Sequence, residues 1–219
     1  LFDVYRHCDV MVVLSEDMKQ LLVDSGVAEH RIAIVPNWTD TSRVYPVPHD
    51  QNPFRVKHGF SDKFVVMYSG NLGLTQRLED VLQAAKAVSN DSRIQFVFVG
   101  KGSQEHSLKQ LAVSLALPNI TFLDYQPQSD LANSLSGADL HLVPLTAGLA
   151  KCLMPSKLYG ILAAGRPCLT NAPPETELHR IVKEKSIGLT VTQGSNPELA
   201  TIIRQSANQQ EELSRMGQR

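Results

Sequence analysis

Hydrophobic and polar positions follow two alternating patterns along this chain. Short apolar runs, such as the continuous run Phe64–Tyr68 and the mostly apolar run Ile94–Val99, are typical of strands buried on both faces of a sheet. The stretches between them place apolar residues three or four positions apart, which predicts helices that pack on those strands. The predicted strands cover 9–14, 31–35, 64–68, 94–99, 120–123, 140–143, 168–170 and 189–191. The predicted helices cover 15–25, 77–88, 129–136 and 177–185. Three further helices are predicted: one ends near residue 116, one ends before residue 165, and one begins at residue 197.

This order of elements predicts an α/β fold, a Rossmann-like parallel sheet with helices on both faces. Residues 38–53 interrupt the pattern, because three prolines stand there among polar residues. Such a stretch is typical of a linker or domain junction. The chain therefore divides into residues 1–37, 38–53 and 54–219.

Composition narrows the class of protein. Hydrophobic residues make up 42% and charged residues 20%, as in a globular domain with a real core, and the formal net charge is −1. That balance gives no global attraction to nucleic acid, so no nucleic-acid partner is expected. Three cysteines without zinc-ligand spacing fit a reducing compartment. Because the chain starts at Leu1 and stops within a helical pattern, we expect a fragment of a longer protein.

Three loops at the carboxyl ends of predicted strands carry the candidate chemistry, since ligands of such sheets bind there. They are Gly70–Gly73, Gly100–Gly102 and the turn Met154–Lys157. Pro155 suits the first position of a helix, and Met154 offers no side-chain oxygen to cap it. The free amides, the helix dipole and Lys157 therefore predict an anion site. An ordinary helix start with a solvated lysine, outside the core, explains the local pattern equally well.

Other chemistries find little support in the sequence. Gly100 and Gly102 supply two glycines of a dinucleotide fingerprint, but Glu105 stands at the third position. Neither a nucleophile elbow, a Walker A loop nor a zinc-protease motif is present, and the histidines do not cluster. We therefore expect no cofactor and, without an Asp-x-Asp pair, no metal.

A set of motifs in fixed order resembles glycosyltransferase family 4, nearest to the bacterial colanic-acid-biosynthesis type. The motifs are Ile34–Asp40, Tyr68–Gly73, Phe98–Gly102, Ala138–Pro144 and Met154–Pro167. The resemblance implies a two-domain GT-B architecture that transfers sugar with retention of configuration and without a metal. Residues 1–37 would then be the tail of the N-terminal acceptor domain, 38–53 the linker and 54–219 the C-terminal nucleotide-sugar-binding domain.

The sequence departs from the family at four positions. Many members carry an arginine and a lysine facing the diphosphate, where this chain has Asn71 and Gln76. Many also carry two glutamates around the donor helix, where this chain has Cys152 and Gly160. The usual basic clamp and the usual acidic contact to ribose are therefore in doubt.

The resemblance implies a set of site residues. Those expected at the donor diphosphate are Gly70, Asn71, Gly73, Ser156 and Lys157. Those expected at the nucleoside or sugar are Gly100, Lys101, Gly102, Tyr125, Gln126 and Glu177. Tyr125 is equally well explained as a surface tyrosine, and Glu177 as a cap of its own helix. No catalytic residue is assigned.

The expected partners are a nucleoside-diphosphate sugar and, through the missing N-terminal domain, a glycan or lipid-linked acceptor. The resemblance places the enzyme in the cytoplasm, in surface polysaccharide biosynthesis, with peripheral association with the inner membrane face. The isolated fragment is expected to be inactive. Two rivals remain: a sugar-nucleotide 2-epimerase of the same architecture and a non-catalytic module derived from it.

Overall fold

The computed structural model describes residues 5, 7–149, 151–192 and 194–219. It contains a two-stranded and a six-stranded sheet, and every strand pair in both is parallel. The small sheet comprises β1 (Met11–Val13) and β2 (Ile32–Ile34). The large sheet comprises β3 (Phe64–Ser69), β4 (Ile94–Val99), β5 (Ile120–Leu123), β6 (Leu140–Leu142), β7 (Cys168–Asn171) and β8 (Gly188–Val191).

The strand order of the large sheet is β5-β4-β3-β6-β7-β8. The chain thus winds outward from β3 to one edge and then returns to β6, beside β3, to build the other half. The carboxyl ends of β3 and β6 flank this change of direction, which is where ligands of open α/β sheets bind.

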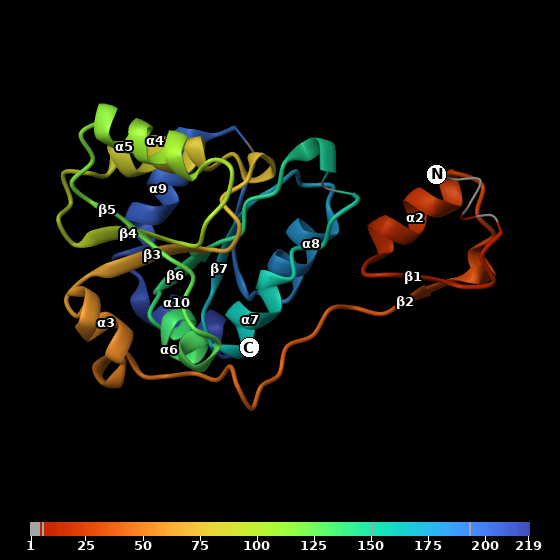
Figure 1. The fold of residues 1–219 in the computed structure, drawn as a ribbon, viewed down its shortest axis with the longest axis horizontal. Helices are drawn as coiled ribbons and strands as arrows, with labels where there is room; N and C mark the ends of the chain where they lie inside the picture. Colours follow the sequence, from red (N-terminus) through yellow and green to blue (C-terminus); the bar gives the residue numbers. More distant parts are fainter. Residues whose placement is uncertain (1–4, 6, 150, 193) are drawn as a thin grey trace.

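Helices cover both faces of the large sheet (Figure 1). In chain order they are α3 (Pro53–His58), α4 (Leu78–Ala87), α5 (Glu105–Ser114), α6 (Leu131–Ser136), α7 (Lys157–Ala163), α8 (Glu177–Glu184), α9 (Asn196–Ser206) and α10 (Gln210–Gly217). The predicted fold class, a Rossmann-like parallel sheet between helices, is confirmed. In the described part of the chain, no helix has both the length and the apolar character that a membrane crossing requires.

Two hydrophobic cores lie on opposite faces of β3, because successive residues of a strand point to opposite sides. Val66 and Tyr68 pack with residues of α4, α5 and α9 on one face. Val65 and Met67 pack with Phe54 of α3 on the other. These cores hold β3 rigidly at the centre of the sheet, so the loop that follows it has a fixed starting point.

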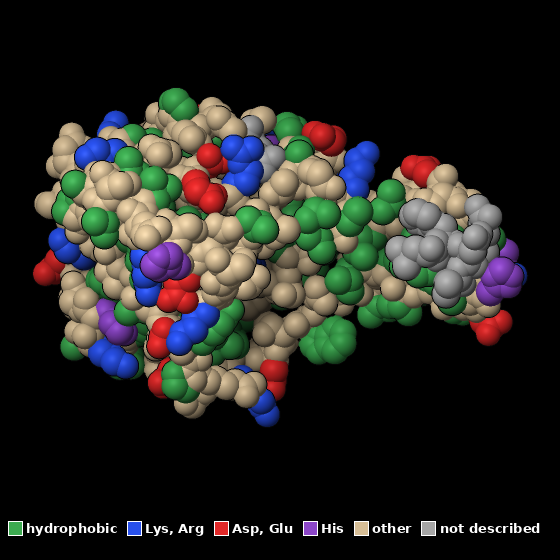
Figure 2. All heavy atoms as spheres, turned by 45° about the horizontal axis from the view of Figure 1, so that its top comes forward, with side chains coloured by type: hydrophobic (Ala, Val, Ile, Leu, Met, Phe, Trp, Pro, Cys, Tyr) green, Lys and Arg blue, Asp and Glu red, His purple; other side chains and the backbone are tan. Residues whose placement is uncertain are grey.

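The segment before residue 36 forms a separate small unit, in which α2 (Glu16–Asp24) packs against β1 and β2. Ser15 caps α2, with its hydroxyl accepting from the Met18 amide at 3.2 Å. Figure 1 shows this unit beside the large one, with an extended segment leading from it to α3. In Figure 2, hydrophobic side chains gather where the two units face each other.

Three predictions about helices need correction. α3 was not predicted, because Pro53 was interpreted only as part of the linker. In the structure Pro53 begins that helix, and Asn52 caps it by accepting from the Phe54 amide. α7 begins at Lys157, two residues after the predicted first position. The helix that Pro197 opens is not the last, since α10 follows it.

Candidate functional site

A cavity of about 540 Å³ lies beyond the carboxyl ends of β3 and β6, at the point where the strand order reverses. Of the described residues that line it, Lys157 alone carries a charged side chain. The other lining residues are Trp38, Thr39, Tyr68, Ser69, Gly70, Asn71, Gln76, Leu131, Leu135, Pro144, Leu145, Leu153, Met154, Pro155, Ser156, Gly160 and Ile161. Lys157 is therefore the one basic side chain among the described residues of the cavity wall, which are otherwise neutral.

The side chain of Lys157 ends in a buried position. The residue as a whole is only half-buried, but its Nζ atom is shielded from solvent and has no hydrogen-bond partner in the described part of the chain. Nζ lies 3.7 Å from the centre of the Tyr68 ring. Burial lowers the pKa of Lys157 to about 7, because leaving water disfavours the charged form. The alternative of a solvated lysine at this helix start is therefore wrong.

The start of α7 differs from the predicted anion site. The amides of Leu158 and Tyr159 donate to the carbonyls of Pro155 (3.1 Å) and Ser156 (3.3 Å). Two amides of the first turn are thus already used in tight turns, so they are not free for a phosphate. The Lys157 side chain remains the group that can meet an anion here.

Tyr68 connects β3, the Lys157 side chain and the loop that contains Asn71. It stands near the end of β3, its ring lies against Lys157, and its hydroxyl donates to the Asn71 carbonyl at 2.7 Å. Burial raises the pKa of Tyr68, so the phenol stays neutral at ordinary pH. Sequence reasoning did not assign this residue, although its place at the carboxyl end of a buried strand was the available signal.

The loop after β3 needs glycine where it passes Lys157. Gly70 has a φ of +142°, and a Cβ there would lie 3.0 Å from the Lys157 Nζ atom. Gly100, with a φ of +139°, passes so close to Gly70 that a Cβ would overlap the Gly70 carbonyl. Backbone bonds fix the two loops together, from Gly70 to Val99 and from Leu72 to the Lys101 carbonyl, both at 2.9 Å.

The residues predicted at the diphosphate are brought together. Gly70, Asn71, Ser156 and Lys157 all line the cavity. Gly73 stands just behind it, facing the Asn71 and Gln76 side chains. Gln76 also lines the cavity, and its Oε1 atom is buried without a partner among the described residues.

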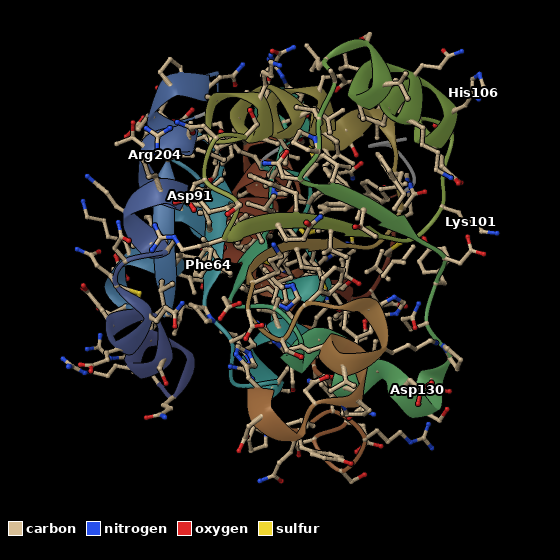
Figure 3. All side chains as sticks on the ribbon, turned by 90° about the vertical axis from the view of Figure 1, so that its left-hand side faces the viewer. Phe64, Asp91, Lys101, His106, Asp130 and Arg204 are labelled. Carbon is tan, nitrogen blue, oxygen red and sulfur yellow. The ribbon has the colours of Figure 1, made fainter. Side chains whose placement is uncertain are left out.

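The residues predicted at the nucleoside form a strip on the neighbouring loops, outside the cavity lining. Gly102 packs on Leu72 and Asn71, and the Tyr125 ring faces Gly100. Tyr125 is 55% exposed, and the Gln126 side chain donates to the Asp124 carbonyl. Lys101 pairs with Asp124 at 3.2 Å and points outward, at the opposite end of the sheet from Phe64 (Figure 3). The strip thus continues the cavity along the carboxyl ends of β4 and β5.

Glu177 lies apart from the other predicted site residues. Its carboxylate accepts from the Asp17 amide at 3.1 Å, while the Asp17 carboxylate accepts from the Glu177 amide at 2.6 Å. Arg180 adds a contact to Asp17 at 2.7 Å. The two helix starts of α2 and α8 therefore cap each other, and Thr176, whose hydroxyl accepts from the His179 amide at 3.4 Å, adds to the cap of α8.

Cys152 and Gly160 stand where many family members carry glutamates, and the structure shows where these two positions lie. Gly160 lines the cavity, so a longer side chain there would reach into it. Cys152 is exposed and lies by a separate apolar pocket next to α2. Among the described residues, no group of three or more histidines, cysteines or acidic residues is placed to hold a metal ion.

Sequence reasoning also missed Trp38 and Thr39, which line the cavity from the segment that precedes α3. Trp38 is 81% exposed. Both residues stand within the motif that supports the family resemblance, but no local pattern says that this segment passes the cavity.

The fold and the site define a class, the doubly wound α/β domains whose ligands bind beyond the strand ends at the switch point. The chain belongs to the family described as "Glycosyl transferases group 1", which matches residues 50–219. This match confirms the family that the sequence motifs predicted.

Two curated relatives support the same assignment. The chain is 32% identical over 204 residues to "Putative colanic acid biosynthesis glycosyl transferase WcaI" of Escherichia coli strain K12, covering 92% of this chain. It is 28% identical over 200 residues to "Probable glycosyltransferase WbjE" of Pseudomonas aeruginosa, covering 91%. The chain spans 50% of the length of each of these relatives.

Among solved structures, the fold matches Anabaena Alr3699/HepE in complex with UDP-glucose. The TM-score is 0.85 at 17% sequence identity, and the match covers 99% of this chain and 59% of that one. The match concerns the fold, and it places the six-stranded unit with the corresponding half of a GT-B protein.

Proposed function

We propose that this chain is the donor-binding half of a retaining, metal-independent glycosyltransferase. It would hold a nucleoside-diphosphate sugar while the sugar passes to a glycan or lipid-linked acceptor in surface polysaccharide biosynthesis. The observation that carries the proposal is Lys157, whose buried and unpartnered Nζ atom lies in the wall of the cavity at the switch point. The UDP-glucose bound by HepE, a protein of the same fold, supports the choice of ligand class.

Lys157 would act on the leaving group. Breaking the glycosidic bond leaves negative charge on the nucleoside diphosphate, and a lysine ammonium held against the phosphates stabilises that charge. Gly70 lets the Lys157 side chain lie against the loop, and the Asn71 side chain and the Ser156 hydroxyl offer donors nearby. Asn71 and Gln76 supply polar contacts where many family members supply charge.

The nucleoside would lie along the strip formed by Gly100, Lys101, Gly102, Tyr125 and Gln126. Tyr125 presents an exposed ring on which a base can stack, and it lies one loop away from the cavity. The earlier assignment of Glu177 to the sugar or ribose would require its contacts with Asp17 to open, because its carboxylate is engaged there.

The domain division follows the same proposal. Residues 1–37 would be the tail of the acceptor domain, 38–53 the linker and 54–219 the nucleotide-sugar-binding domain. The family match begins at residue 50, within the proposed linker. We propose a cytoplasmic enzyme that associates peripherally with the inner membrane face, since lipid-linked acceptors lie there.

A thermal-shift screen with nucleoside diphosphates and nucleotide sugars tests the proposal, because a ligand that binds only the folded state raises its stability. We expect a shift with at least one nucleotide sugar, and the same shift in the presence of a chelator. No shift with any of them would contradict the donor site, and loss of the shift on chelation would contradict metal independence.

The rivals give different results in the same assay. An epimerase would convert a sugar nucleotide in the absence of acceptor, which chromatography of the recovered ligand detects. A non-catalytic module would bind a nucleotide sugar, yet the longer protein would transfer sugar to no acceptor.

A further inference from the structure

We propose that this site takes up a proton when it binds the diphosphate, so that Lys157 changes from an amine into an ammonium against the phosphates. The inference rests on the proposed function and adds a regulation to the same site. Affinity for the donor then depends on pH near neutrality, which a permanently charged basic clamp would not produce.

The geometry leaves Lys157 without a counter-charge. Its Nζ atom lies against the Tyr68 ring on one side, and Gly70 on the other side passes so closely that even a Cβ would lie 3.0 Å away. No carboxylate is among the described residues that line the cavity. The face of the Tyr68 ring attracts an ammonium. Burial without a counter-charge among the described residues nevertheless lowers its pKa, so the proton is weakly held.

The titratable groups that face Lys157 from the neighbouring elements do not change this. Tyr68 of β3 is neutral because burial raises its pKa. His141 of β6 is neutral too, since burial and nearby positive charge lower its pKa to about 4. On α7 itself, burial and Glu177 raise the pKa of Tyr159. Glu177, on α8, is turned to Asp17.

The pKa of Lys157, lowered by burial to about 7, agrees with this picture. A diphosphate within hydrogen-bond distance supplies two negative charges, which favour the ammonium and raise that pKa. The step is a simple protonation: water or buffer gives up one proton, one N–H bond forms at Nζ, and no other bond changes.

Calorimetry in buffers of different ionisation enthalpy measures the number of protons taken up when the ligand binds. The probe is UDP-glucose, with GDP-mannose as the second probe, because a nucleotide sugar has no terminal phosphate that titrates near neutrality. With the 219-residue chain we expect uptake of about half a proton at pH 7 and almost a full proton at pH 8. Affinity should fall about tenfold between pH 6 and pH 8.

Two matched variants show which lysine is responsible. Lys157→Met keeps an unbranched side chain of similar length but cannot take a proton, so uptake should vanish and the weaker binding that remains should not vary with pH. Lys109→Met makes the same replacement at an exposed lysine of α5 that pairs with Glu105, and it should behave as the parent.

Binding of UDP-glucose or GDP-mannose without proton uptake and with equal affinity at pH 6 and pH 8 would overturn the inference while leaving the proposed function intact. Unchanged uptake in Lys157→Met would also overturn it, since another group would then be the one that titrates. Absence of binding by both probes would overturn the inference and the donor site together.

Discussion

A lysine nitrogen without a partner inside a protein is a feature that stability alone would remove. Lys157 forms no salt bridge with any residue that the structure describes, and its nitrogen loses hydration on burial. On the proposed function, the ligand brings the negative charge that this position lacks. Function and stability therefore make opposite demands on this residue.

We predict that Lys157→Met stabilises the unliganded chain while weakening donor binding. The folded-state pKa of about 7 lies below the unfolded value of 10.5, so the unfolded state binds an extra proton between these pH values and the parent gains stability as pH rises. The free energy of unfolding of the variant should exceed that of the parent most at pH 7 or below, on the order of 2 to 4 kcal/mol, and the excess should shrink toward pH 10.5. Urea unfolding at several pH values measures this excess, and an excess that does not change with pH would contradict the buried amine.

Gly70 allows a second prediction at a single residue. Gly70→Ala forces an unfavourable φ and places a Cβ 3.0 Å from the Lys157 Nζ atom, so both stability and donor affinity should fall. Gly59→Ala is the matched control, because its φ of +71° is also strained but nothing lies within 4 Å of the new Cβ. Both variants should lose about 1 kcal/mol of stability. Thermal unfolding measures the stability of the two variants, and calorimetry measures their donor affinity. Equal donor affinity in Gly70→Ala and Gly59→Ala would argue against close packing at Gly70.

At the scale of elements, the hydrophobic pattern predicted β4 and β5 at their observed bounds, because each is a short, mostly apolar run closed by polar or glycine residues. It missed α3, where proline acts as a helix start rather than a break, and it missed the division between α9 and α10, where neither glycine nor proline stands. Local sequence cannot show that the Lys157 side chain is buried, since the ring that covers it comes from β3.

The mutual capping of α2 and α8 is one contact between the small unit and the large one. We predict that Asp17→Ala speeds hydrogen exchange in α2, because it removes a carboxylate that accepts from the Glu177 amide and from Arg180. Such charge-assisted bonds are each worth roughly 1.5–3 kcal/mol. Asp24→Ala on the same helix is the control, because the Asp24 carboxylate accepts from the exposed Gln20 side chain at 2.7 Å. This variant should leave exchange near the α2 start unchanged. Equal effects of the two variants would show that the small unit is held in another way.

At the scale of the whole molecule, the described part of the small unit comprises α2 and the two short strands β1 and β2, whereas the cavity residues proposed to bind the donor diphosphate come mainly from the large unit. We predict that the 219-residue chain binds a nucleotide sugar but transfers no sugar to an acceptor. A radiolabelled donor with membrane extract as acceptor source checks this. Measurable transfer by the purified chain would mean that the acceptor site lies within these residues.

The central claim is that Lys157 meets the diphosphate of a nucleotide donor, and calorimetry with Lys157→Ala tests it most directly. Loss of a charge-assisted contact of roughly 1.5–3 kcal/mol should weaken binding of the nucleoside diphosphate about tenfold or more. Binding of the nucleoside without phosphates should stay nearly unchanged. If Lys157→Ala binds the diphosphate as tightly as the parent does, the buried amine serves another purpose and the proposed site is wrong.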